Sequence, residues 1–256
     1  MTRTAWLALA LLALVPASAG TSTTRPPLAL TATPARLALV GSGSTTVRVT
    51  NPGTSPIRVE ADRVGFSLDV RGRPRTAPLR GPRAAARWVA VSPARFVVPP
   101  GASRSLAVSA RLPGRIEPGD HDALVLLTTR PSIAGGVAVR VRLGVVVVVR
   151  APGAVVRRLA LGSLRVRRHR GASVLELWVA NRGNVTETLG RGRTAFVVGR
   201  GTKRSRLLPT PRDLRPRTSG VLQLAYRGRL RGRVTVRAEI LDGAGRVSRR
   251  TYRVRL

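Results

Sequence analysis

The sequence contains no cysteine, a single lysine (Lys203), two histidines and eight aromatic residues among 256. Without cysteine there are no disulfides, so packed sheets must supply the stability of the chain. The scarcity of aromatic side chains argues against stacking on nucleic-acid bases, and we predict no specific nucleic-acid partner. The longest apolar run past the N-terminal region, Gly144–Val149, is a strand at most, far short of a membrane span.

Signatures of catalysis are also missing. The sequence holds no G-x-S-x-G elbow, P-loop or H-E-x-x-H motif. Gly190–Gly192 and Gly199–Gly201 are basic turns without a following helix, so they lack the context of a phosphate loop. Asn184-Val185-Thr186 fits a glycosylation sequon, which we interpret as chance. We predict that the protein is not an enzyme and holds no cofactor.

Acidic residues number only 11, and the densest polar cluster is Glu117–Asp122. His121 with Asp120 and Asp122 could begin a metal site, but a ligand set needs further donors and the other histidine, His169, is distant in sequence. The favoured interpretation is a turn at Pro118-Gly119, with acids that face solvent or cap that corner. We therefore predict no metal site.

The N-terminus carries the pattern of a secretory signal peptide. Arg3 precedes an apolar run from Ala5 to Val15, Pro16 interrupts it, and Ala17-Ser18-Ala19 supplies small residues before a cleavage site. The sequence predicts a signal peptide at 1–19 and a linker at 20–27. We expect a secreted, periplasmic or cell-envelope protein, with no membrane span in its mature chain.

The net charge is +35, almost all of it from arginine. One interpretation is a polyanion binder that attaches to lipid headgroups or acidic wall polymers. The other is mutational bias toward arginine codons, which abundant Ala, Gly, Pro and Val also suggest. The arginines are spread along almost every segment, which favours the second interpretation.

Period-two alternation punctuated by Gly and Pro predicts an all-β chain. Arg71–Ala86 and Gly41–Ser44 are expected to be loops. The strands expected in the first half are Arg36–Val40, Val47–Thr50, Ile57–Glu60, Trp88–Val91, Phe96–Val98, Ser105–Ala110, Ala123–Thr129 and a long one at Val137–Arg150.

After a hinge at Ala151–Gly153 the pattern restarts. The strands expected there are Leu164–Arg167, Val174–Ala180, Thr194–Val198, Val221–Tyr226, Val234–Leu241 and Thr251–Leu256. Short strands at this spacing predict two immunoglobulin-like antiparallel β-sandwich domains, at 28–151 and 154–256.

The segment Val137–Arg150 is the most informative. Its odd positions are apolar throughout and are expected to face the core. Its even positions begin polar at Arg140 and Arg142 and become apolar at Val146 and Val148. Two explanations remain open for the apolar end: the second domain covers it, or a partner strand adds to this edge.

The first domain resembles the periplasmic pilus chaperones, two-domain proteins that lend a strand to pilin subunits. The similar segments are Thr33–Leu37, Val47–Asn51, Pro99–Ser103, Val146–Pro152 and, in the second domain, Val179–Thr186. The resemblance implies that Arg36 binds the C-terminal carboxylate of a subunit. The lysine that usually assists it would fall near Val146 and is missing, and Arg142 lies earlier on the strand.

A second resemblance is to the peptidoglycan-binding module of WxL-interacting surface proteins. It is carried by Trp88–Pro93, Phe96–Gly101 and Glu117–His121, in the order strand, turn, strand, turn. Both resemblances imply the same fold and location.

Together these observations predict a non-catalytic envelope protein that binds other envelope or surface protein subunits. The alternative is a module that binds peptidoglycan or an anionic wall polymer. The residues expected to contact a partner are Arg36, Arg140, Arg142, Val146 and Val148.

Overall fold

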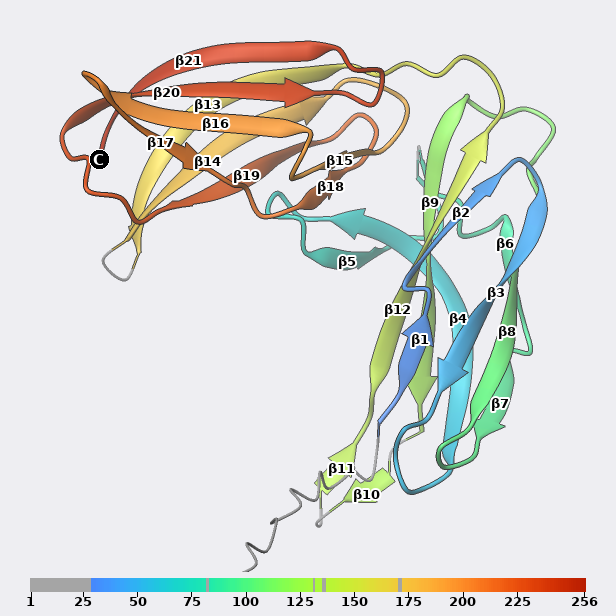
Figure 1. Cartoon of the computed structure of the whole chain (residues 1–256). Coiled ribbons are helices and arrows are strands. Elements are labelled where there is room, and N and C mark those ends of the chain that lie inside the picture. Colours follow the sequence, from blue (N-terminus) through green and yellow to red (C-terminus); the bar gives the residue numbers. More distant parts are fainter. Residues whose placement is uncertain (1–28, 82, 131, 135–136, 170–171) are drawn as a thin grey trace, which may run out of the picture.

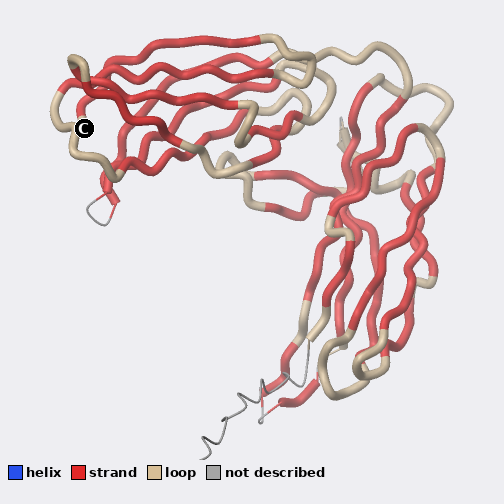
Figure 2. Tube along the Cα trace, in the orientation of Figure 1, coloured by secondary structure: helices blue, strands red, loops and turns tan. Residues whose placement is uncertain are grey.

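The computed structural model describes residues 29–256 apart from 82, 131, 135–136 and 170–171. The predicted signal peptide, 1–19, and linker, 20–27, lie outside the described residues. All regular elements in the described part of the chain are strands, which confirms the all-β prediction (Figures 1 and 2). No helix among these residues is long and apolar enough to cross a membrane.

The first sandwich packs two sheets face to face. The smaller sheet has the order β1 (Thr31–Thr33), β3 (Gly43–Thr50), β8 (Ser103–Ala110), β6 (Val89–Ser92). The larger has the order β2 (Arg36–Val40), β12 (Arg142–Ala151), β9 (Gly119–Thr129), β4 (Ile57–Leu68), β5 (Pro74–Ala77), with β7 (Arg95–Val98) also paired to β4. A small hairpin joins β10 (Ser132–Ala134) to β11 (Val137–Val139).

Alternating side chains build the first core. On β3, Val47 and Val49 are fully buried while Arg48 between them is exposed, as expected for a strand with one solvated face. Leu106 and Val108 of β8 meet them from the neighbouring strand of the same sheet. The burial of these apolar side chains drives the closure of the two sheets on each other.

The second sandwich is built in the same way. One sheet has the order β13 (Leu159–His169), β14 (Ala172–Asn181), β19 (Ser219–Tyr226). The other has the order β17 (Lys203–Leu207), β16 (Thr194–Arg200), β20 (Arg233–Leu241), β21 (Val247–Arg255). A separate pair joins β15 (Glu187–Leu189) to β18 (Arg212–Leu214). The core has its own buried set, centred on Phe196, Leu175, Leu177 and Ile240.

The predicted strands of both halves are present, but three segments differ from expectation. The long strand expected at Val137–Arg150 is interrupted between β11 and β12, and Val139 is 36% exposed rather than in the core. Arg71–Ala86 is not simply an exposed loop, because it contains β5 and the fully buried Ala85 and Ala86. The Gly41–Ser44 loop is shorter than expected, because β3 already begins at Gly43.

The two sandwiches lie at an angle to each other, like the arms of an L (Figure 1). Their cores share no residue, and the chain passes from β12 to β13 through residues 152–158. We keep 28–151 and 154–256 as the proposed domain boundaries. The hairpin of β4 and β5 extends from the first sandwich toward the second, and the Val221 N–H donates to the Val70 carbonyl at its tip (2.7 Å).

A buried asparagine closes the end of a strand in the first sandwich. The Asn51 side-chain amide donates to the carbonyls of Ser55 (2.8 Å) and Val98 (3.0 Å), and its oxygen accepts from the Gly53 N–H (2.9 Å). Asn51 is fully buried, so these bonds satisfy backbone groups that water cannot reach.

The second sandwich repeats this device. Asn181 at the end of β14 donates to the carbonyls of Val185 (2.8 Å) and Leu214 (2.9 Å) and accepts from the Gly183 N–H (2.9 Å). The same three-bond pattern therefore fixes an equivalent corner in both sandwiches.

We expect Asn51→Ala to lower the free energy of unfolding by about 2 kcal/mol, because it leaves buried backbone groups without partners. Urea unfolding followed by tryptophan fluorescence measures the change. Thr46→Ala, at an exposed site on β3, is the control and should stay within about 0.5 kcal/mol of the native chain. Equal effects of the two substitutions would contradict the role given to Asn51.

Candidate functional site

A hollow of about 210 Å³ lies where the two sandwiches meet. The first sandwich contributes Arg36, Phe66, Leu68, Val146 and Val148 to its wall, among others, and the second contributes Thr186, Asp213 and Arg215. The apolar side chains that line the cavity come from the first sandwich, and the charged groups come from both. Three of the five predicted contact residues, Arg36, Val146 and Val148, are brought together here.

Arg36 begins β2, which runs parallel to β12 with Arg36 opposite Val146. Its guanidinium pairs with the carboxylate of Asp213 from the second sandwich. Asp213 also accepts a hydrogen bond from the Thr188 hydroxyl (2.6 Å). Both charged side chains remain about one-third exposed, so the pair is accessible from the hollow.

Val146 and Val148 project to the face of β12 opposite the core. Val145, Val147 and Val149 are fully buried in the first core, as the alternation predicts. Val146 is half-buried, and Val148 is only 4% exposed. The hollow that both line is bounded by residues of the β4–β5 hairpin and of the second sandwich.

Arg140 and Arg142 are not part of the hollow. Arg140 lies between β11 and β12, and Arg142 is the first residue of β12; both are exposed. Four residues of extended strand separate Arg142 from Val146, a distance of roughly 13 Å. The two arginines therefore flank the outer end of the strand.

The edge of β12 is covered along only part of its length. From Arg142 to Ala151 it pairs with β9 on one side, whereas β2 covers the other side only from Val146 to Arg150. The Val146 N–H donates to the Ala35 carbonyl (3.0 Å) and the Val141 carbonyl accepts from Thr129 on β9 (3.0 Å). Because backbone groups alternate in direction along a strand, those of Arg142 and Gly144 point to the side on which no described strand pairs with this part of β12.

The cluster at Glu117–Asp122 differs from the sequence interpretation. Asp120, His121 and Asp122 belong to β9 and are 1–3% exposed, so they do not face solvent. No group of acidic, histidine or cysteine side chains in the described ranges could hold a metal ion. The cluster instead forms the junction of the two sandwiches.

Asp120 is the central acceptor of that junction. Its carboxylate receives two hydrogen bonds from Arg150 (2.6 and 3.1 Å) and one from the backbone N–H of Thr186 in the second sandwich (2.7 Å). The hydrogen bond to Asp120 raises the pKa of Arg150. A charge-assisted bidentate pair of this kind fixes geometry more strongly than a single contact.

Asp122 makes the second charged link. The Arg215 guanidinium donates to its carboxylate (2.6 Å) and also to the Phe66 carbonyl. Burial raises the pKa of Asp122, and the charge and hydrogen bond of Arg215 act in the opposite direction. Arg215, from the second sandwich, is thus bonded to two strands of the first sandwich, β9 and β4.

Asn184 completes the junction at the hinge. Its side-chain amide donates to the carbonyls of Pro118 (3.1 Å) and Ala154 (2.8 Å), and its oxygen accepts from the Val156 N–H (2.7 Å). Only 6% of Asn184 is exposed. A glycan on this nitrogen would replace one of its two donated protons and would have no room beside a side chain buried in the junction, which agrees with a chance sequon.

Sequence reasoning missed Asp213, Arg215 and Phe66. Asp213 is the middle residue of the short strand β18, Arg212–Leu214, and Arg215 follows it directly. The segment lies between two prolines, and no apolar alternation marks it. Their alternating charges are the only local signal. Their role depends on partners 93 or more residues away along the chain.

We expect Asp120→Asn to lower the free energy of unfolding by about 2 kcal/mol, because Arg150 loses its counter-charge. The effect falls below the roughly 3–5 kcal/mol of a fully buried pair because Arg150 is 35% exposed. Urea unfolding measures it. Asp62→Asn, at an exposed site, should change the free energy of unfolding little. A loss as large as that of Asp120→Asn would contradict the role of Asp120 in the junction.

His121 gives the junction a pH dependence. Burial lowers its pKa, although its Nε2 contacts the Glu117 carbonyl (2.8 Å), and Trp88 packs against its ring (4.7 Å between centroids). Its Nδ1 has no hydrogen-bond partner in the described part of the chain. The folded chain therefore binds a proton at His121 less readily than the unfolded chain does.

We accordingly expect stability to be fully present above the unfolded pKa of 6.5 and to decline as pH falls through the lowered folded value. Urea unfolding at a series of pH values between 7 and 5 measures the slope. In His121→Gln the slope over this window should flatten. A slope that persists unchanged in this variant would assign the pH dependence to other groups.

Comparison with known proteins finds likeness in structure only. No family model matches the sequence, and no curated protein matches it. The class 5 fimbriae chaperone CfaA is 14% identical, with 89% of this chain and 100% of that one covered, at a TM-score of 0.50. The YadV chaperone (10% identity, 88% and 99% covered, TM-score 0.49) and the E. coli chaperone DraB (15%, 90% and 98%, 0.46) are also similar.

At this identity the likeness to CfaA concerns the fold alone. It agrees with an all-β chain of two immunoglobulin-like sandwiches, as the sequence predicts. The resemblance to the peptidoglycan-binding module has no support in these comparisons.

Proposed function

We propose that this chain is an exported, non-catalytic envelope protein that binds other envelope or surface protein subunits by pairing with one of their strands, as a pilus-assembly chaperone does. The edge of β12 at Arg142–Val145, with which no described strand pairs on the side away from β9, carries the proposal. Backbone groups of Arg142 and Gly144 point away from β9 there, and unpaired groups at a sheet edge are a template for another strand.

Side chains along this edge suit an added strand. Val139 is partly exposed, and Val141 and Leu143 are half-buried at the margin of the first core. Val141 and Leu143 share one face because side chains alternate along an extended backbone, whereas Val139 belongs to the separate strand β11. A partner strand that extends the sheet would cover them with its own apolar side chains, which adds hydrophobic burial to the backbone hydrogen bonds.

Charges near the edge indicate the chemistry of the partner. Arg140 and Arg142 are exposed at its outer end, and Arg36 lies at its inner end beside the hollow. Arg36 already pairs with Asp213. A carboxylate of the partner that binds Arg36 therefore displaces the carboxylate of Asp213. The fold shared with a fimbriae chaperone agrees with this mode of binding.

The proposal is tested by substitution of Arg142, the first residue of β12. Arg142→Pro removes the outward N–H at a strand end, where proline is tolerated. Arg142→Thr removes the same charge and keeps the N–H. We expect co-purification of the bound subunit from the envelope to fall at least tenfold for the proline variant and to change little for the threonine variant.

Photo-crosslinking locates the contact independently. A photoreactive residue at the exposed position 140 should crosslink to the subunit, whereas the same residue at position 48, exposed on the other sheet, should not. Equal crosslinking at both positions would refute edge pairing. Sedimentation with peptidoglycan that is unaffected by Arg142→Pro, without a crosslinked subunit, would favour the wall-binding alternative.

A further inference from the structure

The outer face of the sheet β17-β16-β20-β21 gathers arginine side chains that are far apart in sequence. The strand registers place Arg204 opposite Gly199, Arg237 opposite Val197 and Arg253 opposite Thr235, all pointing away from the core. Six exposed arginines on this face belong to no ion pair in the described part of the chain: Arg204, Arg206, Arg233, Arg237, Arg253 and Arg255.

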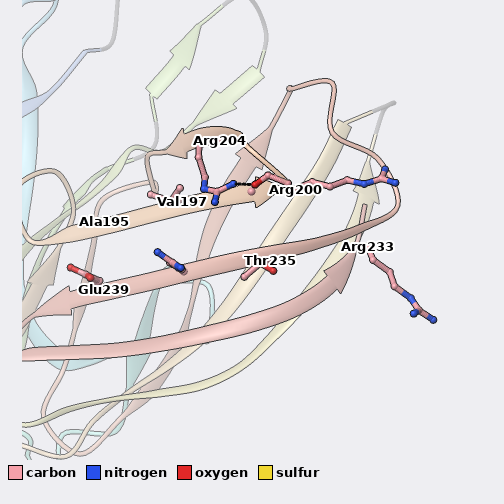
Figure 3. A pocket seen from close by; sticks show the side chains of 10 residues that line it. Ala195, Val197, Arg200, Arg204, Arg233, Thr235 and Glu239 are labelled. Carbon is pink, nitrogen blue, oxygen red and sulfur yellow. Dashed lines mark hydrogen bonds between the residues drawn. The ribbon is translucent and has the colours of Figure 1, made fainter.

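The central strand of this face carries only small side chains. Ala195, Val197 and Gly199 of β16 form the floor of a trough of about 490 Å³. Figure 3 shows Arg204 reaching over the floor, with Arg200 and Arg233 toward one end and Glu239 toward the other. Because β17 and β20 flank β16 at one strand spacing each, the two arginine-bearing walls are roughly 10 Å apart.

Arginine abundance alone does not produce this face. On the first sandwich, the outward positions of β3 and β8 are mainly serine and threonine, with Arg48 as an exception. On the other sheet of the second sandwich, the outward side of β14 holds Val174, Glu176, Trp178 and Ala180, and the neighbouring β13 adds Arg165 and Arg167, of which Arg167 pairs with Glu176. A codon bias would load all faces alike, whereas the six unpaired arginines of the β17-β16-β20-β21 face outnumber those on either of these two faces in the described part of the chain.

The arrangement leaves the charges without compensation. Arg233 lies directly opposite Arg255 on adjacent strands, and like charges in that position destabilise a sheet. The one acid of the face, Glu239, is already paired with Arg249 (3.0 Å). A bound anion would relieve the repulsion, so the face is arranged for a ligand rather than for stability.

We propose that this trough binds a linear phosphate polymer that lies along β16 between the two arginine walls. A guanidinium fork holds a phosphate in a bidentate manner. A phosphate within an extended chain presents two non-bridging oxygens on opposite sides, so both walls can hold it at once. The carboxylate of an acidic glycan projects from one side of a sugar and reaches only one wall.

Other polyanions fit the trough less well. A nucleic-acid single strand requires aromatic platforms for its bases, and the outward positions of these four strands hold none: Tyr252 of β21 lies on the core side. A bilayer surface is planar and would span the walls without entering the trough. The ligand is therefore a narrow chain with charge along its backbone.

The test uses the mature chain and fluorescently labelled inorganic polyphosphate in an anisotropy titration at several salt concentrations. The variant Arg204→Thr, Arg233→Thr, Arg237→Thr removes three trough charges at exposed strand positions, one from the β17 wall and two from the β20 wall. The control Arg48→Thr, Arg104→Thr, Arg111→Thr removes three exposed charges from the first sandwich. Circular dichroism verifies that both variants are folded.

We expect the native chain to bind and the trough variant to lose roughly tenfold or more in affinity, with a log–log salt slope smaller by about 2. In the control variant, the slope of log affinity against log salt concentration should differ from the native slope by less than about 1. Equal losses in both variants would show general charge attraction and overturn the proposal. So would absence of binding by the native chain, or tighter binding of polygalacturonate, single-stranded DNA or anionic vesicles than of polyphosphate.

Discussion

The carboxylate of Asp120 is the contact on which the arrangement of this molecule depends. It is almost fully buried, yet it accepts bonds from Arg150 at the end of the first sandwich and from the backbone of Thr186 in the second. A buried charge is tolerated only when its partners are complete. The two sandwiches must therefore meet in one relative position to satisfy it, and that position forms the hollow that contains Arg36 and Val146.

Backbone shape supports the same junction. Gly119, next to Asp120, adopts a φ of +108°, and a Cβ there would lie 2.1 Å from the Asn184 carbonyl oxygen. Only glycine allows this conformation and this close approach. The sequence predicts a turn at Pro118-Gly119. Its glycine is required because the backbone lies against Asn184 of the second sandwich, and not because the turn is exposed to solvent.

The sequence predicted much of the fold because apolar alternation is a local signal. Strands such as β3 and β20 were found because their valines recur at every second position. Shorter strands were missed: β17, Lys203–Leu207, is polar on both faces over most of its length and shows no period. The burial of Asp120 and Asp122 was mispredicted for a different reason. It depends on Thr186 and Arg215, which lie 66 and 93 residues away, and no local pattern reports such partners.

Arginine content illustrates the same limit. Along the chain the arginines are evenly spread, which favoured an explanation by composition. Strand register then decides which of them share a face, and register was not readable from the sequence. Among the described residues, one face collected six unpaired arginines, whereas the outward face of β3 and β8 has Arg48 and that of β13 and β14 has Arg165 and the ion-paired Arg167.

The parallel pairing of β2 with β12 has a consequence for any strand that lies beside β12. Because β2 occupies the edge from Val146 onward, it acts as an end-stop: an added strand can slide no further than Gly144 or Val145. Since a shift of one residue exchanges the two faces of a strand, a fixed end determines which side chains of the newcomer turn inward. The molecule would thus select its partners by alignment as well as by composition.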